Sequence, residues 1–365
     1  MKIAMFTDAF RKDIGGGSKV VIDLVSGLTE RGHDVLVVTG QSVDDSAKGF
    51  KVLRLPSISY PFYDKAEMIL PSLELIRALK DFNPHLIHYH EPFTAGMIAL
   101  IVSKYLKKKV VGTIHIDPMH LSQYAFKVDN GNVAKMLVGF VSRQSDAISF
   151  VSHYQKETYY PYLRKNGFYP VIYPGIPDYF FSERNAVFGK IVITVSRLAP
   201  EKNLEFAFKV MSLVQKKADV DYHVVGNGPK RRELESYAEA LGLKVKFWGN
   251  VKREKLPELY RNSSVFFLPS KTETFGLVFA EAMACGLPVV ALNEGAAPEV
   301  VGEAGIIQEE KAEKVADSII NLIRNKELWE KKSTKAKNRA ELFKKELFIA
   351  GYENLYRKFA TPFTN

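Results

Sequence analysis

Residues 2–39 read KIAMFTDAFRKDIGGGSKVVIDLVSGLTERGHDVLVVT. The stretch opens with Lys2–Thr7, an apolar run of strand length, and three glycines, Gly15–Gly17, precede a segment with helical spacing. That segment, Lys19–Arg31, stops at a glycine, and a second strand-like run, His33–Thr39, follows. Because parallel neighbours need a long crossover connection, a strand, a helix and a strand in this order predict a parallel sheet.

The same alternation continues through the first half of the chain. Further strand-like runs there are Val52–Leu55, Leu86–Tyr89, Val110–Ile114 and Ala147–Val151, with helical patterns such as Leu73–Phe82 and Thr94–Tyr105 between them. Strands that are apolar on both faces indicate a mainly parallel sheet covered by helices.

The second half repeats the pattern after a seam around Tyr173–Gly189, where prolines and glycines interrupt the chain. Its strand-like runs are Ile191–Val195, Tyr222–Val225, Val245–Trp248, Ser264–Leu268 and Val289–Leu292. Its helical runs are Asn203–Lys216, Arg231–Leu241, Lys255–Asn262, Val278–Cys285 and Ala312–Arg324. We therefore predict an α/β protein with two doubly wound Rossmann-like domains that face a cleft, the first spanning residues 1–176 and the second residues 177–344. A last helical stretch, Trp329–Phe359, is expected to pack back across the first domain through residues 345–365.

The charge of the chain indicates the kind of partner it meets. Its 365 residues carry a formal net charge of +10, and the pI is near 9.3. This excess suits an anionic partner: a nucleic acid, an acidic lipid surface or a phosphorylated substrate. The basic residues are dispersed, with local clusters at Lys104–Lys109 and Lys252–Lys255. We expect both clusters to be solvated, and a loose attraction to a membrane surface is the alternative.

Several classes of protein are excluded by the composition. The single cysteine, Cys285, rules out a disulfide framework and Cys-rich metal sites, and its apolar neighbours indicate a small buried side chain rather than a nucleophile. No run of about 18 apolar residues is present, so no transmembrane helix is expected. Because Met1–Phe6 reads as a strand, no signal peptide is expected, and a reducing, intracellular setting fits.

Two segments that follow predicted strands could contact phosphate. Gly15–Gly17 would let backbone N–H groups approach a phosphate at a helix N-terminus, although neither the dinucleotide fingerprint nor the P-loop pattern is present. Arg197 and Lys202 come directly after the first strand of the second domain, where a guanidinium and an ammonium can hold a diphosphate and neutralise a leaving group. Gly226–Pro229 ends the next strand and could admit a ligand near the backbone.

The segment Glu273–Glu281 brings two carboxylates and free backbone N–H groups to a helix N-terminus. Glu281 lies among small apolar residues, so its carboxylate needs a partner or a ligand. The two glutamates are eight positions apart, which is roughly 12 Å at a helical rise. One carboxylate could therefore meet a sugar hydroxyl while the other meets a ribose hydroxyl. The alternative is a capping glutamate and an exposed helical glutamate.

Three histidines lie at the ends of strands in the first domain. His88 and His90 share one face of a strand, but no third ligand follows at a metal-like spacing, so structural or acceptor-site roles are favoured. His115 follows a buried strand and is a site candidate, with a structural histidine as the alternative.

These motifs together resemble the retaining family-4 glycosyltransferases with the GT-B fold, over nearly the whole chain. The matching segments are Gly15–Gly17, Pro84–Pro92, Thr113–His115, Ser196–Asn203, Val225–Pro229 and Glu273–Glu281. The chain departs from the family at Ser196, where glycine is frequent, and at Tyr173–Asp178, where an Asn-Gly pair is frequent.

The resemblance implies a role for each candidate residue. It assigns Gly16 and Gly17 to the donor phosphates, Arg197 and Lys202 to the diphosphate, and Glu273 to hydroxyls of the donor sugar. It further places the backbone N–H groups of Phe275, Gly276 and Leu277 near that sugar, Glu281 at the ribose, Val251 beside the base and His115 beside the transferred sugar. The catalytic set is then His115, Arg197, Lys202 and Glu273, and no metal is required.

The resemblance also implies an activity: transfer of a hexose from a nucleoside-diphosphate sugar to an acceptor hydroxyl, with retention of configuration. We expect mannose or glucose on GDP or UDP as co-substrate, no other cofactor and no nucleic-acid partner. The aromatic and apolar segments Tyr60–Leu70 and Met119–Phe126, together with the basic surface, favour a lipid or lipid-linked acceptor and a cytoplasmic protein at the inner face of the membrane. The alternatives are a GT-B relative with other chemistry, such as a sugar-nucleotide epimerase or a phosphorylase, and a binding subunit without catalytic activity.

Overall fold

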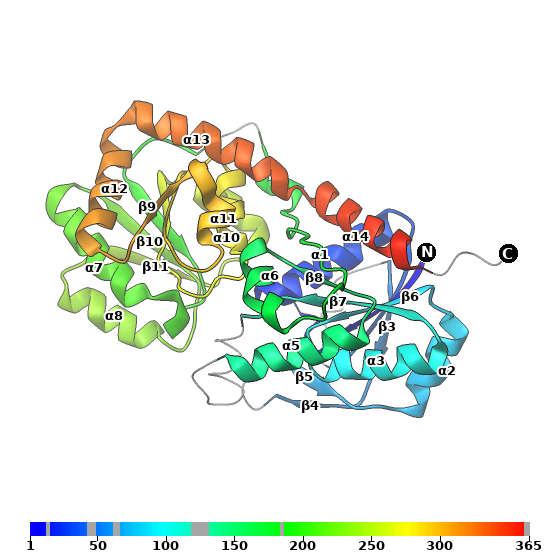
Figure 1. Ribbon diagram of the computed structural model, residues 1–365. Coiled ribbons are helices and arrows are strands. Elements are labelled where there is room, and N and C mark those ends of the chain that lie inside the picture. Colours follow the sequence, from blue (N-terminus) through cyan, green and yellow to red (C-terminus); the bar gives the residue numbers. More distant parts are fainter. Residues whose placement is uncertain (12–14, 42–48, 61–65, 118–130, 183–185, 361–365) are drawn as a thin grey trace. The chain divides into compact units, whose positions relative to one another are not determined.

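The computed structural model describes residues 1–11, 15–41, 49–60, 66–117, 131–182 and 186–360. The chain divides into two compact units, the first made of Met1–Gly175 and Lys345–Asn365 and the second of Ile176–Lys344. Each unit is built around a six-stranded parallel sheet with helices against it (Figure 1). The predicted α/β class with two Rossmann-like domains is therefore confirmed. The segment Met119–Phe126 and residues 61–65 lie outside the described part of the chain.

The sheet of the first unit has the strand order β3-β2-β1-β6-β7-β8. Its strands are β1 (Lys2–Thr7), β2 (Asp34–Thr39), β3 (Lys51–Arg54), β6 (Leu86–His90), β7 (Lys109–Ile114) and β8 (Ala147–Phe150). Its helices are α1 (Gly16–Glu30), α2 (Leu73–Phe82), α3 (Thr94–Leu106), α5 (Asn132–Gln144), α6 (His153–Tyr159) and α14 (Lys345–Phe359). A short antiparallel pair, β4 (Ser57–Ser59) and β5 (Glu67–Ile69), stands beside this sheet. Each strand expected in the first half is confirmed, with ends that move by one residue at most.

The two faces of this sheet differ in chemistry. Ile87 and Tyr89 of β6 join an apolar core with side chains of α2, α3 and α5. The alternate residues His88 and His90 point to the opposite face, since successive side chains of a strand alternate. That second face is mixed, with polar side chains on β6 beside apolar ones such as Met5 and Val111, and α14 packs against it: the Tyr356 hydroxyl contacts His88.

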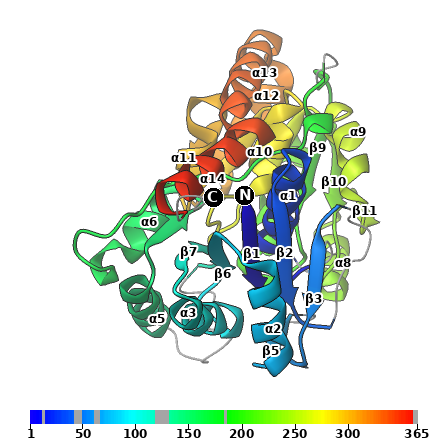
Figure 2. The same ribbon diagram turned by 90° about the vertical axis from the view of Figure 1, so that its right-hand side faces the viewer.

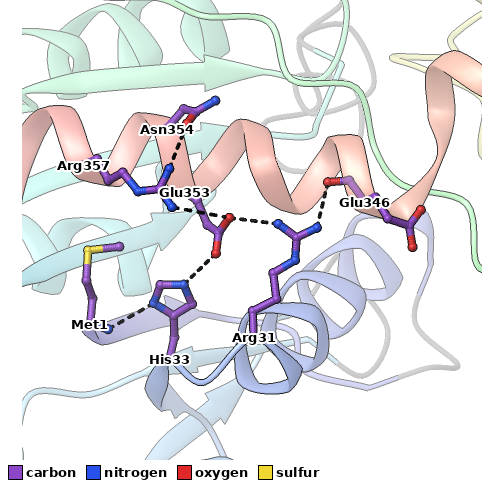
Figure 3. A network of polar contacts seen from close by, with 7 residues as sticks. All are labelled: Met1, Arg31, His33, Glu346, Glu353, Asn354 and Arg357. Atoms are coloured by element: carbon purple, nitrogen blue, oxygen red, sulfur yellow. Dashed lines mark hydrogen bonds and ion pairs between the residues drawn. The ribbon is translucent and has the colours of Figure 1, made fainter.

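A cluster of polar contacts ties α14 to the turn between α1 and β2 (Figure 3). The Glu353 carboxylate accepts from the Arg31 guanidinium at 2.8 Å and lies 2.9 Å from Nε2 of His33. A second nitrogen of Arg31 donates to the carbonyl of Glu346 at 3.3 Å. Burial alone would raise the pKa of Glu353, but its hydrogen bonds to His33 and Arg31 outweigh burial and lower it. The carboxylate is therefore held ionised in the network that anchors the last helix of the first unit.

The second unit repeats the doubly wound plan with the order β11-β10-β9-β12-β13-β14. Its strands are β9 (Ile191–Val195), β10 (Asp221–Val225), β11 (Val245–Gly249), β12 (Val265–Leu268), β13 (Val289–Leu292) and β14 (Ile306–Gln308). Its helices are α7 (Leu204–Lys217), α8 (Arg231–Ala240), α9 (Leu256–Arg261), α10 (Leu277–Ala284), α11 (Ala297–Val301), α12 (Ala312–Arg324) and α13 (Lys326–Ala340). The sequence did not predict β14, a three-residue edge strand that ends on a polar residue.

The helical stretch predicted over Trp329–Phe359 is two helices rather than one. Helix α13 ends at Ala340, a short 3₁₀ turn covers Glu341–Phe343, and α14 begins at Lys345. The Phe343 carbonyl leaves the helical pattern and accepts the backbone N–H of Ile176 at 2.7 Å. This pairing at the boundary of the second unit explains the break, which falls where one unit ends and the other resumes.

Candidate functional site

The strand order of the second unit creates a switch point between β9 and β12. Chain order runs from β9 to β10 on one side, whereas β12 lies on the other side of β9. Loops that leave these two carboxyl ends therefore diverge, and such a point is where α/β sheets bind ligands. Arg197 and Lys202 follow β9, and Glu273 follows β12. The fold thus brings three of the candidate residues to one position at the sheet edge.

Lys202 and Glu273 form a direct ion pair. The Lys202 ammonium lies 2.6 Å from Oε1 of Glu273, and the two side chains are 19% and 13% exposed. An ammonium has three donors and a carboxylate about four acceptor positions, so each group can still bind a ligand while it holds the other. A cation for phosphate and an acceptor for sugar hydroxyls are thereby fixed side by side.

Arg197 lies at the same strand end but pairs with a different carboxylate. Its guanidinium donates to Glu201 at 2.7 Å, and its side chain is 48% exposed. Burial raises the pKa of Glu201, but the hydrogen bond and the charge of Arg197 outweigh burial and lower it. Arg197 is thus oriented by Glu201 while much of its side chain remains accessible.

The loop that carries Arg197 rests on a glycine-rich neighbour. Gly226 has φ +128°, and a Cβ on it would lie 1.9 Å from the carbonyl oxygen of Ser196. A Cβ on Gly228 would lie 2.3 Å from the carbonyl oxygen of Leu198, whose N–H donates to Asn227 at 2.9 Å. The sequence suggested that these glycines admit a ligand. In the structure they admit the backbone of the adjacent loop, because a side chain at either position would push that loop away.

Glu273 is supported in the same way by a glycine that the sequence did not single out. The N–H of Ala296 donates to the Glu273 carbonyl at 2.8 Å. Gly295, at φ +59°, lies so close that a Cβ would be 2.7 Å from the same carbonyl oxygen. The Gly-Ala pair after β13 was a usable sequence signal, since it follows a strand at the same edge of the sheet.

Glu281 is buried in α10 and has its own cation. Its Oε1 lies 2.7 Å from Nε of Arg253, with side chains 4% and 10% exposed. The prediction that this carboxylate needs a partner is borne out by that ion pair. The prediction that Lys252–Lys255 is a solvated cluster is wrong for Arg253, because the buried carboxylate holds its guanidinium inside the unit. Helix α10 starts at Leu277, so the helical spacing assumed between Glu273 and Glu281 applies only to its second half.

The remaining candidate residues of the second unit are Gly276, Leu277, Phe275 and Val251. Gly276 caps the start of α10 at φ +84°, and its carbonyl accepts the Phe279 N–H at 2.9 Å. The N–H groups of the first turn of a helix have no intrahelical partner, and Leu277 is the first residue of that turn. Phe275 is buried and packs edge-on against Phe343, with ring centroids 5.2 Å apart. Val251 is half-buried in the loop after β11. Val251 follows β11, and Phe275, Gly276 and Leu277 follow β12, so all of them come after the carboxyl ends of strands of this sheet.

In the first unit, the glycine loop and His115 meet. Gly16 and Gly17 open α1, and a Cβ on Gly17 would lie 3.4 Å from Cβ of His115. The ring of His115 is buried, and burial lowers its pKa to about 4. Near neutral pH this imidazole is uncharged, so it can donate or accept one hydrogen bond but does not supply a positive charge.

His88 and His90 lie on one face of β6, as predicted, and both are fully buried. His88 is held between the hydroxyls of Tyr356 at 2.8 Å and Thr113 at 2.7 Å. Nδ1 of His90 lies 3.0 Å from Nε2 of His115. Among the residues that the structure describes, no group of three or more His, Cys, Asp or Glu side chains is arranged to hold a metal ion.

Two acidic residues near this cluster were missed by the sequence analysis. Asp8 follows β1 and accepts from the Thr94 hydroxyl at 2.6 Å; burial raises its pKa to about 6. Glu91 follows β6, and burial raises its pKa to about 8. Glu91 is the residue after His90, so the strand-end position that drew attention to His115 would also have identified it.

Comparison with known families matches the chain in two adjoining parts. The family model described as Glycosyltransferase Family 4 matches residues 14–180, and the one described as Glycosyl transferases group 1 matches residues 176–340. None of the helices in the described part of the chain combines the length and hydropathy that crossing a bilayer requires.

Individual relatives resemble the chain at low identity. A sulfoquinovosyl transferase of Arabidopsis thaliana is 27% identical over 76% of this chain, which spans 56% of the length of that relative. An alpha-monoglucosyldiacylglycerol synthase of Acholeplasma laidlawii is 25% identical over 98% of this chain and 96% of its own length. A crystal structure of Anabaena HepE in complex with UDP-glucose superposes with a TM-score of 0.77 at 21% identity, over 98% of this chain and 100% of that one. At 21% identity, the similarity to the HepE structure supports the fold alone.

Proposed function

We propose that this chain, which belongs to the family-4 glycosyltransferases with the GT-B fold, transfers a hexose from a nucleoside-diphosphate sugar to an acceptor hydroxyl with retention of configuration. The observation that carries the proposal is the ion pair of Lys202 and Glu273 at the switch point between β9 and β12. A phosphate-binding cation and a hydroxyl-binding carboxylate 2.6 Å apart match the two chemical parts of a sugar diphosphate. UDP-glucose in Anabaena HepE makes a UDP-sugar a reasonable first donor.

In this proposal the second unit binds the donor. Arg197 and Lys202 neutralise the diphosphate, and Glu273 accepts hydrogen bonds from the sugar, with N–H groups at Phe275, Gly276 and Leu277 beside it. Glu281, which Arg253 holds in place, binds the ribose, and Val251 borders the base. In the first unit, Gly16 and Gly17 contact the phosphates, and His115 lies beside the sugar.

Transfer then needs little covalent chemistry from the protein. The bond between C1 and the diphosphate oxygen breaks as the acceptor oxygen bonds to the same face of C1, and the acceptor proton passes to the departing diphosphate. Negative charge grows on that diphosphate, so Arg197 and Lys202 stabilise the transition state more than the ground state. The scheme uses no metal ion.

The test compares two lysines in ion pairs of the same unit. Lys202→Ala should lower transfer about a hundredfold or more, the usual cost of one group that stabilises developing charge. Lys217→Ala is the control, because Lys217 pairs with Asp317 at the far end of α7 and both side chains are more than half exposed. Unchanged release of nucleoside diphosphate by Lys202→Ala, across a panel of UDP- and GDP-hexoses, would refute the proposal.

A surface of the first unit supports a lipid or lipid-linked acceptor. Helices α3 and α5 lie side by side (Figures 1 and 2), and neither contains an acidic residue. Their exposed large apolar side chains are Ile101, Tyr105, Val133, Met136 and Phe140. Exposed cations, Lys104 and Arg143, stand on the same helices, and Nζ of Lys80 lies 5.2 Å above the Tyr105 ring. Apolar side chains among cations are what an anionic lipid surface attracts. We therefore propose that this surface meets a membrane, and that the membrane face concerned is the inner, cytoplasmic one expected from the sequence.

This part of the proposal has its own test. Co-sedimentation with phosphatidylglycerol vesicles should be strong at low salt, weaker at about 0.5 M salt because of screening, and reduced by Met136→Asp. Leu347→Asp on α14 is the matched control, since Leu347 is also an exposed leucine-sized side chain of the first unit. Equal binding of both variants, or no binding by the original chain, would contradict membrane docking and favour a small soluble acceptor.

A further inference from the structure

Two carboxyl groups stand side by side at the carboxyl ends of β1 and β6. Thr7 of β1 pairs with His90 of β6. Asp8 and Glu91 are the next residues, so they are neighbours at the ends of two adjacent parallel strands, and the charge of Asp8 raises the pKa of Glu91. The strand order of the first sheet reverses between β1 and β6, and such a switch point is where α/β sheets bind ligands.

One oxygen of Glu91 is unpaired. Oε1 accepts the backbone N–H of His115 at 3.0 Å, whereas Oε2 is buried and meets no hydrogen-bond partner among the residues that the structure describes. Burial raises the pKa of Glu91 to about 8, so the carboxyl is largely protonated at pH 7 and, since Oε1 is the acceptor, Oε2 carries the proton. Ionised or protonated, a buried oxygen without a partner is unfavourable. Glu91 as a whole is only half-buried, so a ligand at the surface can supply the missing partner.

The backbone holds Glu91 in an unusual conformation. Its φ is +73°, in the left-handed region that residues other than glycine rarely adopt. The turn is fixed on both sides: the Glu91 N–H donates to the Thr113 carbonyl at 2.9 Å, and a Cβ on Gly96 would lie 2.4 Å from the Glu91 carbonyl oxygen. Backbone strain of this kind is common where a fold positions a functional group.

Two half-buried aromatic residues lie beside Asp8. The Tyr60 hydroxyl donates to Oδ2 of Asp8 at 3.3 Å, and the rings of Tyr60 and Phe93 meet edge-on with centroids 6.0 Å apart. Asp8 also accepts from the Thr94 hydroxyl and the Ala95 N–H at the start of α3, so it fixes Tyr60 and supplies charge. Apolar rings with a few convergent polar groups are typical of small-molecule sites. We call this set the acid–aromatic cluster: Asp8, Tyr60, Glu91 and Phe93.

The ends of β6 and β7 supply no positive charge to this cluster. Their segments Leu86–Gly96 and Val111–Asp117 contain no lysine or arginine. Burial lowers the pKa of His115 to about 4 and that of His90 well below its ordinary value, so both rings are uncharged at pH 7. Burial raises the pKa of Asp8 to about 6, which leaves it largely ionised at pH 7. An anionic ligand would meet this carboxylate, whereas a hydroxyl would not be repelled.

The first cation after β1 is Arg11. Its backbone is tied to Ser18 of α1, whose hydroxyl accepts the Arg11 N–H at 2.9 Å and donates to the Arg11 carbonyl at 2.6 Å. The backbone of Arg11 therefore lies by the start of α1, where the proposed function places the donor phosphates. The ends of β6 and β7 are left for an uncharged group.

We propose that the acid–aromatic cluster is the acceptor subsite and that it takes an uncharged polyol, a glyceryl or glycosyl headgroup, in preference to a phosphorylated one. Oε2 of Glu91 bonds a hydroxyl of that headgroup, and the rings of Tyr60 and Phe93 line it. The charge of Asp8 disfavours a phosphate at the same place. The inference rests on the proposed function, because only a transferase has an acceptor, and it adds the chemistry of the group that is glycosylated.

The first experiment compares acceptors that differ by one phosphate. The glyceryl pair is monooctanoylglycerol and its phosphate, and the glycosyl pair is methyl α-glucoside and its phosphate, each offered to the full chain with the nucleotide sugar that it hydrolyses fastest. We expect kcat/KM for the neutral member of at least one pair to exceed that of its phosphate by about tenfold or more, because the phosphate meets a like charge. The pair that responds tells a glyceryl from a glycosyl acceptor. Equal or higher kcat/KM for the phosphates, or hydrolysis without transfer to either neutral acceptor, would overturn the proposal.

Substitutions then assign the effect to single residues. Asp8→Asn keeps an oxygen for the start of α3 but removes the charge, so it should reduce the preference for the neutral acceptor about tenfold. Glu91→Leu should lower the ratio of transfer to hydrolysis about tenfold, the usual effect of one lost hydrogen bond. Glu91→Gln keeps an acceptor for the His115 N–H and places an amide donor at the position of Oε2, so it should restore most of that ratio.

The ratio of transfer to hydrolysis separates acceptor binding from a structural role. A residue that only holds His115 slows both reactions alike, so an unchanged ratio in Glu91→Leu would overturn the assignment of Oε2. Glu353→Gln is the control for lost stability in the same unit, because Glu353 anchors α14 in the network of Figure 3 and should leave the ratio unchanged. If Glu91→Leu fails to fold, the acceptor pairs and Asp8→Asn still decide. Absence of any nucleotide-sugar hydrolysis contradicts the proposed function itself, whereas hydrolysis without preference for the neutral acceptors contradicts only this inference.

Discussion

Breaking the ion pair of Arg253 and Glu281 should lower the stability of the second unit, by an amount that follows from the burial of both side chains. Replacing Arg253 by Met keeps the length of the side chain but leaves the Glu281 carboxylate, 4% exposed, without its cation. Removing one partner of a buried pair costs about 3–5 kcal/mol, because the remaining charge stays desolvated. For a domain of this size each kcal/mol corresponds to roughly 2–4 °C in Tm. We therefore expect the unfolding transition of the second unit to fall by about 6–12 °C, the range that the lower bound of 3 kcal/mol gives.

The assay is thermal unfolding of four chains: the original, Arg253→Met, Glu281→Gln and the double variant. If the pair is coupled, the double variant should lose less than the sum of the single losses, since it leaves no unpaired charge. Glu281→Gln alone should also weaken the shift in Tm caused by the bound nucleotide sugar, because Glu281 is the proposed ribose contact. A Tm for Arg253→Met within about 1 °C of the original would refute the reasoning, since it would mean that the guanidinium contributes no more than an exposed pair.

Three further outcomes follow from the same structure. Gly226→Ala should prevent stable folding of the second unit, since its Cβ would lie 1.9 Å from the Ser196 carbonyl oxygen. Gly242→Ala is the control: it has open space around it and should lose only the roughly 1–2 kcal/mol that a left-handed alanine costs. Equal urea midpoints for the two variants would contradict this. Burial raises the pKa of Glu91 to about 8, so between its ordinary value and pH 8 the folded chain keeps a proton that the unfolded chain loses, and stability should fall by up to about 1.4 kcal/mol per pH unit as pH rises. Glu91→Gln should flatten this slope, and a slope identical to that of the original chain would argue against a buried carboxyl. Burial also raises the pKa of the Cys285 thiol to about 12, so a thiol reagent at pH 8 should label the folded chain far more slowly than the unfolded one, and equal rates would show that the thiol is exposed.

The fold could be predicted from the sequence because the central strands of both sheets are buried on both faces. The runs Ile191–Val195 and Val289–Leu292 are apolar apart from Thr194, so their ends are clear in the sequence. The structure gives strands with the same ranges. The break between α13 and α14 was not readable. It depends on the pairing of Phe343 with Ile176, far away in the chain, and Glu341–Phe343 has no proline or glycine that would mark it.

The candidate site was predictable in part for a similar reason. Strand ends and local motifs identify Lys202, Glu273 and His115, and the fold places the first two in contact. The sequence could not show which cation meets which carboxylate. Arg253 reads as one of several charges in a surface turn, and only the position of Glu281 in α10 makes it a buried partner. The same holds for Gly295, whose importance comes from its closeness to Glu273.

The histidines illustrate a further limit. Period-two alternation predicts that His88 and His90 share a face, and they do. His88 meets Thr113 of β7 and Tyr356 of α14, which lie 25 and 268 positions away in the chain. His90 instead meets His115, which follows β7. Spacing alone therefore gives the face of the strand, while the role of each ring depends on which distant element packs against that face.

The most direct test of the central claim is the configuration of the sugar that the enzyme releases. With an α-linked nucleoside-diphosphate hexose and water as the slow acceptor, ¹H NMR at early times should show α-hexose appearing first, at a rate that Lys202→Ala reduces about a hundredfold. The α-anomer is expected because, in the proposed mechanism, departure and attack occur on one face of C1 while Arg197 and Lys202 neutralise the leaving diphosphate. Release of β-hexose first would contradict retention. Failure of every UDP- and GDP-hexose to yield nucleoside diphosphate would contradict the assignment of Lys202 and Glu273 to donor binding and transfer.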